Sequence, residues 1–358
     1  MSPFLILSAN SASDRGIWLD LWSVWPDREI FAHPDYVQLY ANPQARAMAA
    51  VWRSHELNII YPFLLRDLSV EPFWAAGDLR AFDITSAYGY SGPFAWGPGD
   101  RQAVGRQFWA EFQDWAAAHD VASEFVRFSL FDDMLLPYPG QRWNAGDHII
   151  RPLDANESDM WIEFDHKVRK NVNKALRSGV RIETDETGDR VSEFLDIYRH
   201  TMDRRRALNF YYFPRELFDQ LHRSLQGAFI YFYAVVDGAT VSAELVLVSE
   251  RSVYSFLGGT REEWFSCRPN DLLKLSVIKW AQGRRKRNFV LGGGYQAGDG
   301  IYRYKLAFAP NGRTPYYLGG RVLSEELNAE LIRAREQFAT SHAEAWSPRP
   351  AFFPAYRS

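Results

Sequence analysis

Two basic residues beside a run of glycines are the first candidates for chemistry in this sequence. The stretch LGGGYQAGDGIYRYKLAFAP, residues 291–310, contains Arg303 and Lys305. Aromatic residues alternate with them and follow them: Tyr302, Tyr304 and Phe308. This alternation is typical of a strand, so Arg303 and Lys305 should point to the same side. Two cations on one face could hold a carboxylate, a phosphate or a developing oxyanion.

The glycines that precede these cations allow two interpretations. Gly292, Gly293 and Gly294 match neither the G-x-G-x-x-G pattern of dinucleotide-binding folds nor a P-loop, because no Lys-Ser/Thr pair follows them. One interpretation is a tight turn that leaves the buried strand NFVLGG. The other is a flexible loop at the rim of a cleft, where Arg303 and Lys305 face the chemistry.

A second group of cations lies on a predicted helix over residues 165–179. Asp165 is a plausible N-cap and Gly179 a plausible residue just past its end. Its apolar face should consist of Val168, Val172, Ala175 and Leu176. Its basic residues, which have no acid among them, are Lys167, Arg169, Lys170, Lys174 and Arg177. They form either a phosphate-binding stripe or a solvated helix face.

Two further segments are candidate binding surfaces. DITSAYGYSGP, residues 83–93, is dense in Gly, Tyr and Ser, and we expect Tyr88 and Tyr90 to line a ligand pocket unless the segment is only a structural loop. We also expect Tyr254, on the predicted strand SVYSFLGG, to contact substrate.

Glu244 lies inside the apolar stretch TVSAELVLV. A carboxylate there is costly unless it faces solvent or is paired, and an arginine is the expected partner. A desolvated Glu has a raised pKa, so it could also act as a general base that deprotonates an ammonium group. These alternatives remain open at the level of sequence.

Composition excludes several classes of protein. The chain has 358 residues, 47% of them apolar, a net charge of −3 and a single cysteine, Cys267. A disulfide framework and a cysteine-rich metal site are therefore excluded, and no metal-ligand spacing is present. Polyanion contacts must come from local basic patches. We find no signal peptide and no bilayer-spanning apolar run, and we expect a cytoplasmic protein without stable membrane insertion.

The order of elements in the second half predicts a fold. Helices over 165–179, 189–206 and 214–227 are followed by a meander of three strands, with Asp237-Gly238 as a hairpin turn. A helix at NDLLKLSVIKWAQGRRK and a buried strand at NFVLGG complete the order expected of an N-acetyltransferase-like (GNAT) domain.

The first half repeats this order less clearly. A short helix at HPDYVQLYA, two strands at MAAVWRS and ELNIIYPFLL, a helix at RQAVGRQFWAEFQDWAAAH and a strand at EFVRFSLF are expected. We predict an α+β fold of two tandem GNAT-like domains, residues 1–150 and 151–322. A helical tail over residues 323–358 should pack on the first domain.

Three motifs, in this order, resemble the FemABX family of nonribosomal peptidyl (aminoacyl) transferases. They are YGYSGP, the basic helix RKNVNKALRSGV, and LGGGYQAGDGIYRYKLAFAP with its aromatic-Lys-x-x-Phe pattern at Tyr304, Lys305 and Phe308. The resemblance covers roughly residues 30–325. Its best-known members move an amino acid from aminoacyl-tRNA to an amine of a peptidoglycan precursor.

The resemblance implies roles for these residues. Lys305 would stabilise the oxyanion formed when the amine attacks the ester, Arg303 would assist it or bind phosphate, and the basic helix would contact tRNA or a nucleotide-sugar pyrophosphate. Neither a cofactor nor a metal is expected. The pyrophosphate loop of acyl-CoA-dependent GNAT enzymes is missing, although an acyl-CoA-dependent N-acyltransferase acting on an amino sugar or lipid amine is the main alternative. A non-catalytic tRNA- or glycan-binding module is the third hypothesis.

Overall fold

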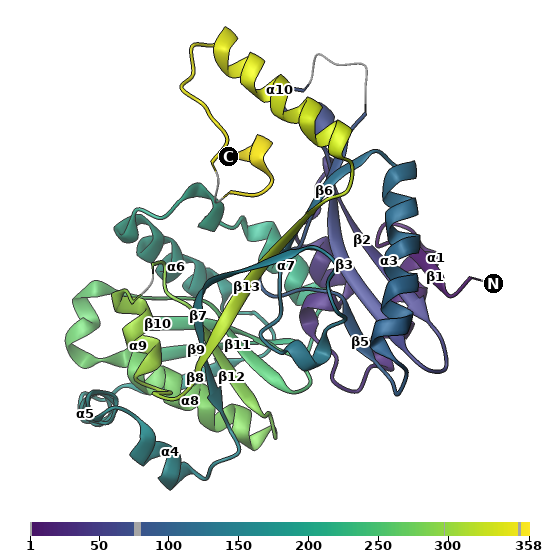
Figure 1. Cartoon of the computed structure of the whole chain (residues 1–358). Helices are drawn as coiled ribbons and strands as arrows, with labels where there is room; N and C mark the ends of the chain where they lie inside the picture. Colours follow the sequence, from purple (N-terminus) through teal and green to yellow (C-terminus); the bar gives the residue numbers. More distant parts are fainter. Residues whose placement is uncertain (1, 75–79, 297, 350–351) are drawn as a thin grey trace. The chain divides into compact units, whose positions relative to one another are not determined.

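The computed structural model describes residues 2–74, 80–296, 298–349 and 352–358 (Figure 1). Its contacts divide the chain into two compact units. Unit 1 comprises residues 1–26, 31–145 and 316–358, and unit 2 comprises residues 27–30 and 146–315. The predicted boundary at residue 150 lies within strand β7 (Gln141–Pro152), which contributes residues to both units.

Unit 1 is a mixed sheet with helices. Its strands are β1 (Phe4–Ser8), β2 (Ala45–Arg53), β3 (Asn58–Asp67), β4 (Phe82–Thr85), β5 (Phe94–Trp96), β6 (Val121–Arg127) and the second half of β13 (Arg313–Val322). Its α-helices are α1 (Ala12–Ser23), α2 (Pro34–Gln38), α3 (Arg101–Ala118) and α10 (Glu325–Ser341). The strand order is β1-β2-β3-β4-β6-β13, and β5 pairs with β3.

Unit 2 also contains a run of paired strands. Its strands are the second half of β7, β8 (Arg181–Asp185), β9 (Phe229–Val236), β10 (Ala239–Val248), β11 (Ser252–Thr260) and β12 (Asn288–Gly292). Its α-helices are α4 (Glu157–Glu163), α5 (His166–Arg177), α6 (Val191–Arg205), α7 (Arg215–Ser224), α8 (Pro269–Gly283) and α9 (Gly300–Leu306). The strand order is β8-β9-β10-β11-β12-β7.

The strand orders of the two units follow one plan, which confirms the predicted tandem arrangement of GNAT-like domains. In each unit the fourth and fifth strands of the order are parallel: β4 with β6, and β11 with β12. The neighbouring pairs are antiparallel. The sixth strand also pairs antiparallel with the fifth, as β13 with β6 and β7 with β12.

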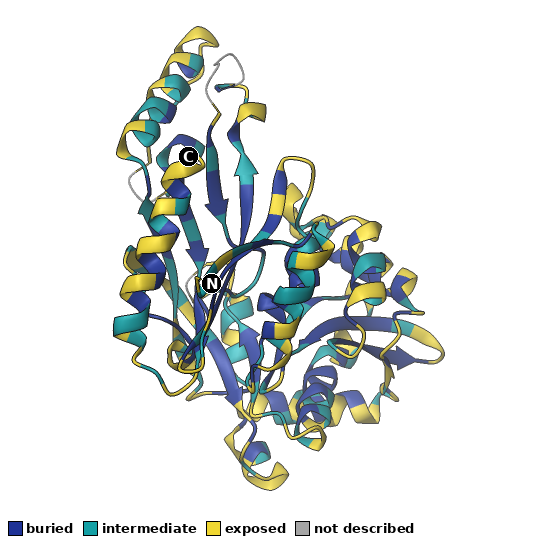
Figure 2. Cartoon of the chain, turned by 90° about the vertical axis from the view of Figure 1, so that its right-hand side faces the viewer, coloured by how far each residue is buried: buried dark blue, intermediate teal, exposed yellow. Residues whose placement is uncertain are grey.

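Side chains of β9 alternate between two hydrophobic layers in unit 2. Ile230, Phe232 and Ala234 belong to the core that includes the buried faces of α5 and α8. On the other side of the strand, the Tyr231 ring packs edge-on against Phe194 of α6. The strands are largely buried, whereas exposed residues lie on the outer faces of helices and on loops (Figure 2).

Strands β11 and β12 form a fork. Their paired residues run only from Ser252 with Asn288 to Tyr254 with Val290. Past this point β11 remains paired with β10 as far as Thr260, across a register shift at Leu245/Val246. Strand β12 remains paired with β7, where Gly292 is opposite Ile149 after a second register shift. Beyond Tyr254 and Val290 the two strands therefore pair with different neighbours, β10 and β7.

Helix α5 begins and ends as the sequence predicts. The Asp165 side chain caps it by accepting a hydrogen bond from the Lys167 backbone N at 3.0 Å, and Gly179 has a φ of +76°. Val168, Val172 and Ala175 are buried as expected. The prediction for Leu176 was wrong, because this side chain is 56% exposed on the outer face.

Residues 300–306 form helix α9 and not the strand that the alternation of aromatic and basic residues predicted. Asp299 nucleates the helix: its Oδ1 accepts a hydrogen bond from the Tyr302 backbone N at 2.7 Å. Successive residues of an α-helix are rotated by about 100°, so Arg303 and Lys305 point to nearly opposite sides. Arg303 is exposed, whereas Lys305 is turned into the protein.

The C-terminal segment belongs to unit 1. There Arg357 contacts two carboxylates: its Nε lies 2.7 Å from Asp83 Oδ2 and its Nη1 lies 2.7 Å from Glu71 Oε1. Arg66 binds the same Asp83 through two hydrogen bonds of 2.7 and 2.9 Å. Within the described residues, no helix is long and apolar enough to cross a membrane.

Candidate active site

Lys305 lies at the fork between β11 and β12. Its Nζ donates a hydrogen bond of 2.7 Å to the backbone carbonyl of Gly293, the first residue after β12. Burial, together with the positive charge of Lys274, lowers the pKa of Lys305 to about 7. Glu244 and Asp299 act in the opposite direction on this pKa. Close to neutral pH, Lys305 is therefore balanced between its cationic and neutral forms.

Lys274 and Glu244 form a buried ion pair on the other branch of the fork. Lys274 extends from α8, and its Nζ contacts Glu244 Oε1 of β10 and donates to Ser255 Oγ of β11 at 2.7 Å. The side chains of Lys274 and Glu244 are only 7% and 4% exposed. The partner that the sequence predicted for Glu244 was an arginine, and the structure supplies a lysine.

Glu244 retains one uncommitted oxygen. Its Oε2 is buried and has no hydrogen-bond partner among the described residues. A buried carboxylate oxygen without a donor is costly, so it marks a position where an incoming N–H or ammonium group would be bound favourably. Lys274 holds the other oxygen, Oε1.

His148 on β7 completes the surroundings of the fork. A Cβ built on Gly293 would lie 2.6 Å from His148 Cδ2, so only glycine fits at this position without displacing the imidazole. Burial and the neighbouring Lys305 charge lower the pKa of His148 to about 3. The imidazole is thus neutral at physiological pH and adds no further positive charge beside Lys305.

The three glycines of the opening motif have separate structural roles. Gly292 ends β12 with a φ of +79°, which few other residues adopt. A Cβ on Gly294 would lie 2.5 Å from Asp299 Oδ1. Asp299 also ties the loop down, because its Oδ2 accepts hydrogen bonds from the backbone N of Tyr295 at 2.8 Å and of Gln296 at 3.1 Å. The glycines therefore allow a close turn whose carbonyl group at Gly293 positions Lys305.

The aromatic residues around Lys305 support helix α9. Tyr304 OH donates to the Asn270 backbone carbonyl at 3.2 Å. Its ring packs edge-on against Phe308, with centroids 5.3 Å apart. Phe308 is fully buried in the core of unit 2. In the structure these two predicted binding residues fix α9 against its surroundings and thereby hold Lys305 at the fork.

The basic residues of α5 divide into two groups. Arg169 closes the end of α4, because its Nη1 donates to the backbone carbonyls of Ile162 at 2.7 Å and Phe164 at 2.5 Å. Lys167, Lys170 and Lys174 are exposed. The structure thus brings the predicted stripe together on one helix but gives Arg169 a structural contact.

Helix α5 also meets the start of α8. Asn171 Nδ2 donates to Asp271 Oδ1 at 3.1 Å. Burial raises the pKa of Asp271 to about 6, although Asn171, Arg268 and Lys167 all oppose the rise. The loop that opens α8 has Arg268 and Pro269 at its end and carries no glycine run. A buried acid in the first turn and a proline without an N–H make this helix start a poor cradle for a pyrophosphate.

The remaining predicted binding residues make other contacts. Tyr88 and Tyr90 belong to unit 1, where Tyr36 OH donates to the Tyr88 backbone carbonyl at 2.7 Å and Tyr90 packs edge-on against Tyr316. Tyr254 lies at the last paired position of β11 but is buried, and its OH donates to Glu29 Oε2 at 2.7 Å.

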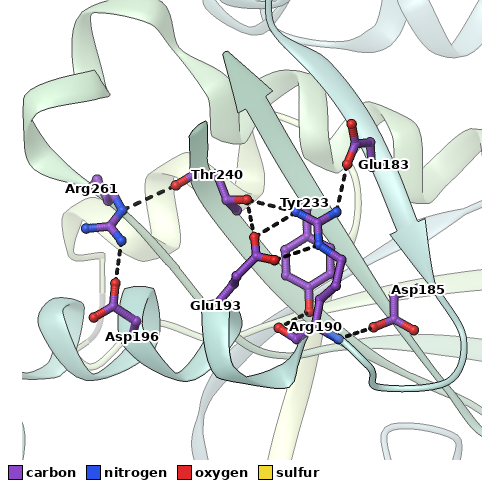
Figure 3. Close-up of polar contacts among 8 residues, drawn as sticks. All are labelled: Glu183, Asp185, Arg190, Glu193, Asp196, Tyr233, Thr240 and Arg261. Carbon is purple, nitrogen blue, oxygen red and sulfur yellow. Dashed lines mark hydrogen bonds and ion pairs between the residues drawn. The ribbon is translucent and has the colours of Figure 1, made fainter. Parts of the chain in front are cut away.

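A second polar cluster in unit 2 is centred on Arg190 (Figure 3). The guanidinium donates to Glu183 Oε2 at 2.7 Å and to both oxygens of Glu193 at 2.9 and 2.7 Å. It also lies 4.3 Å from the centroid of the Tyr233 ring. Since these charges pair with one another, the cluster ties the start of α6 to strands β8, β9 and β10. An open hollow of about 640 Å³ borders it, with Trp264 and Arg261 in its wall.

Sequence reasoning missed Lys274, Ser255 and His148. Lys274 had a detectable signal, since it stands three, four and seven positions before Val277, Ile278 and Ala281 on the buried face of α8. A lysine at such a position must find a buried partner. Nothing in the sequence singles out Ser255 or His148.

Comparisons with known proteins agree with this geometry. The family model of the acetyltransferase (GNAT) domain matches residues 163–306, which include α5 to α9 and the fork. The crystal structure of FemX superposes with a TM-score of 0.64 at 13% identity, over 88% of this chain and 98% of FemX. No curated protein sequence matches the chain.

Two further solved structures share the fold. One is the C-terminal domain assigned to a lysylphosphatidylglycerol synthetase from Agrobacterium fabrum, with a TM-score of 0.55 at 14% identity over 92% of this chain and 97% of that one. The other is L-PGS from Bacillus licheniformis, with a TM-score of 0.51 at 12% identity over 92% of this chain and 97% of that one. These structural similarities show a common fold, and residues 163–306 of the chain match the acetyltransferase (GNAT) domain.

Proposed function

We propose that this protein is an aminoacyltransferase that uses aminoacyl-tRNA as its donor. The proposal starts from the match of its second unit to the acetyltransferase (GNAT) domain. Its acceptor is an amine of a peptidoglycan precursor or of a related small molecule. The observation that carries the proposal is the partly buried Lys305 at the β11–β12 fork, which donates to the Gly293 carbonyl. It lies within electrostatic reach of Glu244, whose Oε2 has no hydrogen-bond partner among the described residues. The FemX-like fold supports the same class of donor.

The cluster supplies the groups that such a transfer requires. The acceptor ammonium loses a proton to Glu244, and its nitrogen attacks the carbonyl carbon of the aminoacyl ester. The protonated form of Lys305 stabilises the oxyanion that develops. When the C–O bond to the ribose breaks, the ribose oxygen takes up a proton and an amide remains on the acceptor. Positioning and charge stabilisation account for catalysis, and no covalent enzyme intermediate is formed.

Two features of unit 2 favour a tRNA donor over acyl-CoA. The start of α8 lacks a glycine-rich loop and buries Asp271 in its first turn, which disfavours a pyrophosphate at that place. The exposed Lys167, Lys170 and Lys174 on α5 supply a cationic surface suited to a nucleic-acid backbone. Arg303, exposed on the outer side of α9, is available for phosphate contact but not for the oxyanion.

The second candidate function is N-acyl transfer from acyl-CoA to an amino sugar or a lipid amine. The match to the acetyltransferase domain favours it, because that domain match covers the whole fork. This candidate would use Lys305 and Glu244 in the same roles, with a thioester in place of the ester. The two functions differ in the donor, so binding of the donor separates them.

The test is a titration of the full chain with bulk aminoacyl-tRNA and with acetyl-CoA, at low and at moderate salt. The proposal predicts tRNA binding that weakens steeply as salt rises, without CoA binding, and weaker tRNA binding for Lys170→Glu. CoA binding without tRNA binding would establish the second candidate. Donor binding that is accompanied by no transfer, in the wild type as in Lys305→Ala, would leave a non-catalytic binding module.

A further inference from the structure

Unit 2 carries an exposed group of apolar side chains next to a run of arginines. Leu208, Phe210 and Tyr212, in the segment between α6 and α7, are 61%, 55% and 38% exposed. Arg204, Arg205 and Arg206 directly precede them at the end of α6. Contiguous exposed apolar surface of this kind marks an interaction site more often than isolated exposed residues do.

Phe265 extends this surface from another element. It lies in the 3₁₀ segment Glu262–Cys267 and is 43% exposed. The Arg204 guanidinium lies 4.8 Å from the centroid of the Phe265 ring and donates to the Thr260 carbonyl at 3.1 Å. We call Arg204, Arg205, Arg206, Leu208, Phe210, Tyr212 and Phe265 together the arginine–aromatic surface.

Hydrogen bonds hold the backbone beneath this surface, so the exposed side chains extend from a defined scaffold. Tyr198 OH of α6 donates to the Tyr211 carbonyl at 2.7 Å. The Ala207 backbone N donates to the Met202 carbonyl at 3.0 Å, next to Arg206 in the left-handed conformation. Phe213 anchors the end of the segment in the interior. Ordering cost on binding is therefore small.

Charges of both signs border the surface, and the arginines are the ones that adjoin Leu208, Phe210 and Tyr212 in the sequence. Arg205 and Arg206 are exposed. The nearest acid in sequence, Asp203, accepts a hydrogen bond from Tyr212 OH at 2.8 Å. Glu262 and Glu263 are the exposed acids beside Phe265. The three arginines thus form a cationic edge along the aliphatic and aromatic side chains.

We propose that the arginine–aromatic surface docks the protein onto the surface of an anionic lipid membrane, where Leu208 and Phe210 enter the interface and the arginines contact lipid phosphates. Aromatic and aliphatic side chains flanked by arginine are the combination that partitions into the headgroup region. Single-stranded RNA also binds arginine and aromatic rings. It gains nothing from Leu208, which is the most exposed apolar side chain of the set.

This inference is independent of the acyl donor. Docking at a membrane would bring the acyltransferase to acceptors that are themselves attached to lipid. It involves no helix that spans the membrane. Loss of transfer activity would leave vesicle binding unchanged, and loss of vesicle binding would leave donor binding unchanged, so failures of the two proposals can be told apart.

The experiment is co-sedimentation of the full chain with vesicles of phosphatidylcholine and with mixed vesicles that also contain phosphatidylglycerol. We expect binding to the mixed vesicles that weakens with salt, and little binding to phosphatidylcholine alone. Replacing two arginines, as Arg205→Gln with Arg206→Asn, should weaken binding about ten-fold or more. Phe210→Ser and Leu208→Ser should each weaken it several-fold, by roughly the loss of one inserted side chain.

Ile162 on α4 provides the matched control. Its side chain is 72% exposed and lies beside the acid Glu163, and its backbone carbonyl, which a serine retains, accepts a hydrogen bond from Arg169. Ile162→Ser should leave vesicle binding within about two-fold of wild type, since one CH₂-rich side chain outside the surface contributes nothing to docking. Equal binding to both kinds of vesicle, or an unchanged affinity in Phe210→Ser and Leu208→Ser, would overturn the proposal. So would displacement of the vesicles by a short single-stranded RNA.

Discussion

Each unit of the molecule has a buried glutamate on a strand, and the two carboxylates differ in how many of their oxygens have a hydrogen-bond donor. In unit 1, Glu124 of β6 accepts hydrogen bonds on both oxygens, from Arg321 Nε at 2.9 Å and from Tyr61 OH at 3.0 Å. In unit 2, Glu244 of β10 is paired on one oxygen only, and a second lysine, Lys305, lies within electrostatic reach of it.

Under the proposed function, this difference distinguishes a structural ion pair at Glu124 from a ligand site at Glu244. Around Glu124 both carboxylate oxygens have a donor, although Arg321 Nη2 is buried without a hydrogen-bond partner among the described residues. The Arg321 guanidinium also lies over the Trp109 and Phe112 rings. Around Glu244 two lysines share one carboxylate, and the pKa of Lys305 falls to about 7 as a result of burial and of Lys274. Uneven charge and an open acceptor are typical of functional sites.

The largest expected contrast comes from removing the cation of each cluster. Lys305→Ala should lower kcat/KM by about 10²–10³-fold, because the oxyanion loses its donor, with little change in the free energy of unfolding. Arg321→Ala should instead reduce the free energy of unfolding by about 3–5 kcal/mol, because it leaves Glu124 charged and unpaired in the core. Steady-state kinetics and urea unfolding of both variants test whether Lys305→Ala mainly lowers the rate and Arg321→Ala mainly lowers the stability. Equal losses of stability and of rate in the two variants would remove the distinction.

Replacing each glutamate by glutamine sharpens the comparison. Glu244→Gln should lower the transfer rate by about 10²-fold because the amine loses its base, while donor affinity is retained. Glu124→Gln should retain the rate of the folded enzyme and lower the free energy of unfolding by about 1–3 kcal/mol, through weaker hydrogen bonds to Arg321. Single-turnover rates and circular dichroism distinguish the outcomes. Unchanged kinetics in Glu244→Gln would exclude this residue from the mechanism.

The pH dependence tests the coupling of Lys305 to Lys274. Because the cationic form of Lys305 stabilises the oxyanion, kcat/KM should fall as the pH rises through about 7, the pKa of this group. Lys274→Met removes a positive charge and releases Glu244, and both changes raise the pKa of Lys305. The falling limb should therefore move to higher pH by roughly one unit or more. A lower rate with the limb at its wild-type position would show that Lys274 has only a structural role.

The smallest expected effect concerns the carbonyl that holds Lys305. Gly293→Ala should lower kcat by roughly ten-fold, because a Cβ 2.6 Å from His148 shifts the loop and its hydrogen bond to Lys305. A Cβ on Gly300, in the first turn of α9, would meet nothing within 4 Å, so Gly300→Ala should change kcat by less than about two-fold. Similar kinetics for both alanine variants would contradict the role assigned to Gly293.

Much of the fold can be predicted from local signals. Helix α5 has a capping Asp165 and a terminal Gly179, and the β9–β10 hairpin has Asp237-Gly238 with positive φ at both residues. These features act within a few residues, so the sequence displays them directly. The pairing of β13 with β6 and of β7 with β12 joins segments that are far apart in the sequence, and no local pattern indicates it.

The candidate site is harder to predict, and α9 shows why. Tyr-Arg-Tyr-Lys alternates aromatic and basic residues as a strand would, but Asp299 caps a helix there. On this helix Lys305 donates a hydrogen bond to the Gly293 carbonyl. Lys305 and Glu244 were identified from their residue types, whereas Lys274 was missed although it stands among the buried positions of α8. Proximity of these three residues follows from β10, α8 and α9 meeting at the fork, which only the tertiary structure supplies.

The most direct test of the proposed function is a single-turnover transfer reaction with the wild-type chain. Labelled amino acids are supplied as a mixture of aminoacyl-tRNAs, and a parallel reaction contains labelled acetyl-CoA instead. Both reactions include a nucleotide-linked muramyl peptide that bears a free amine. The account predicts a new amide on the acceptor from at least one aminoacyl-tRNA, and none from acetyl-CoA. An acetylated acceptor with no aminoacylated product would contradict it.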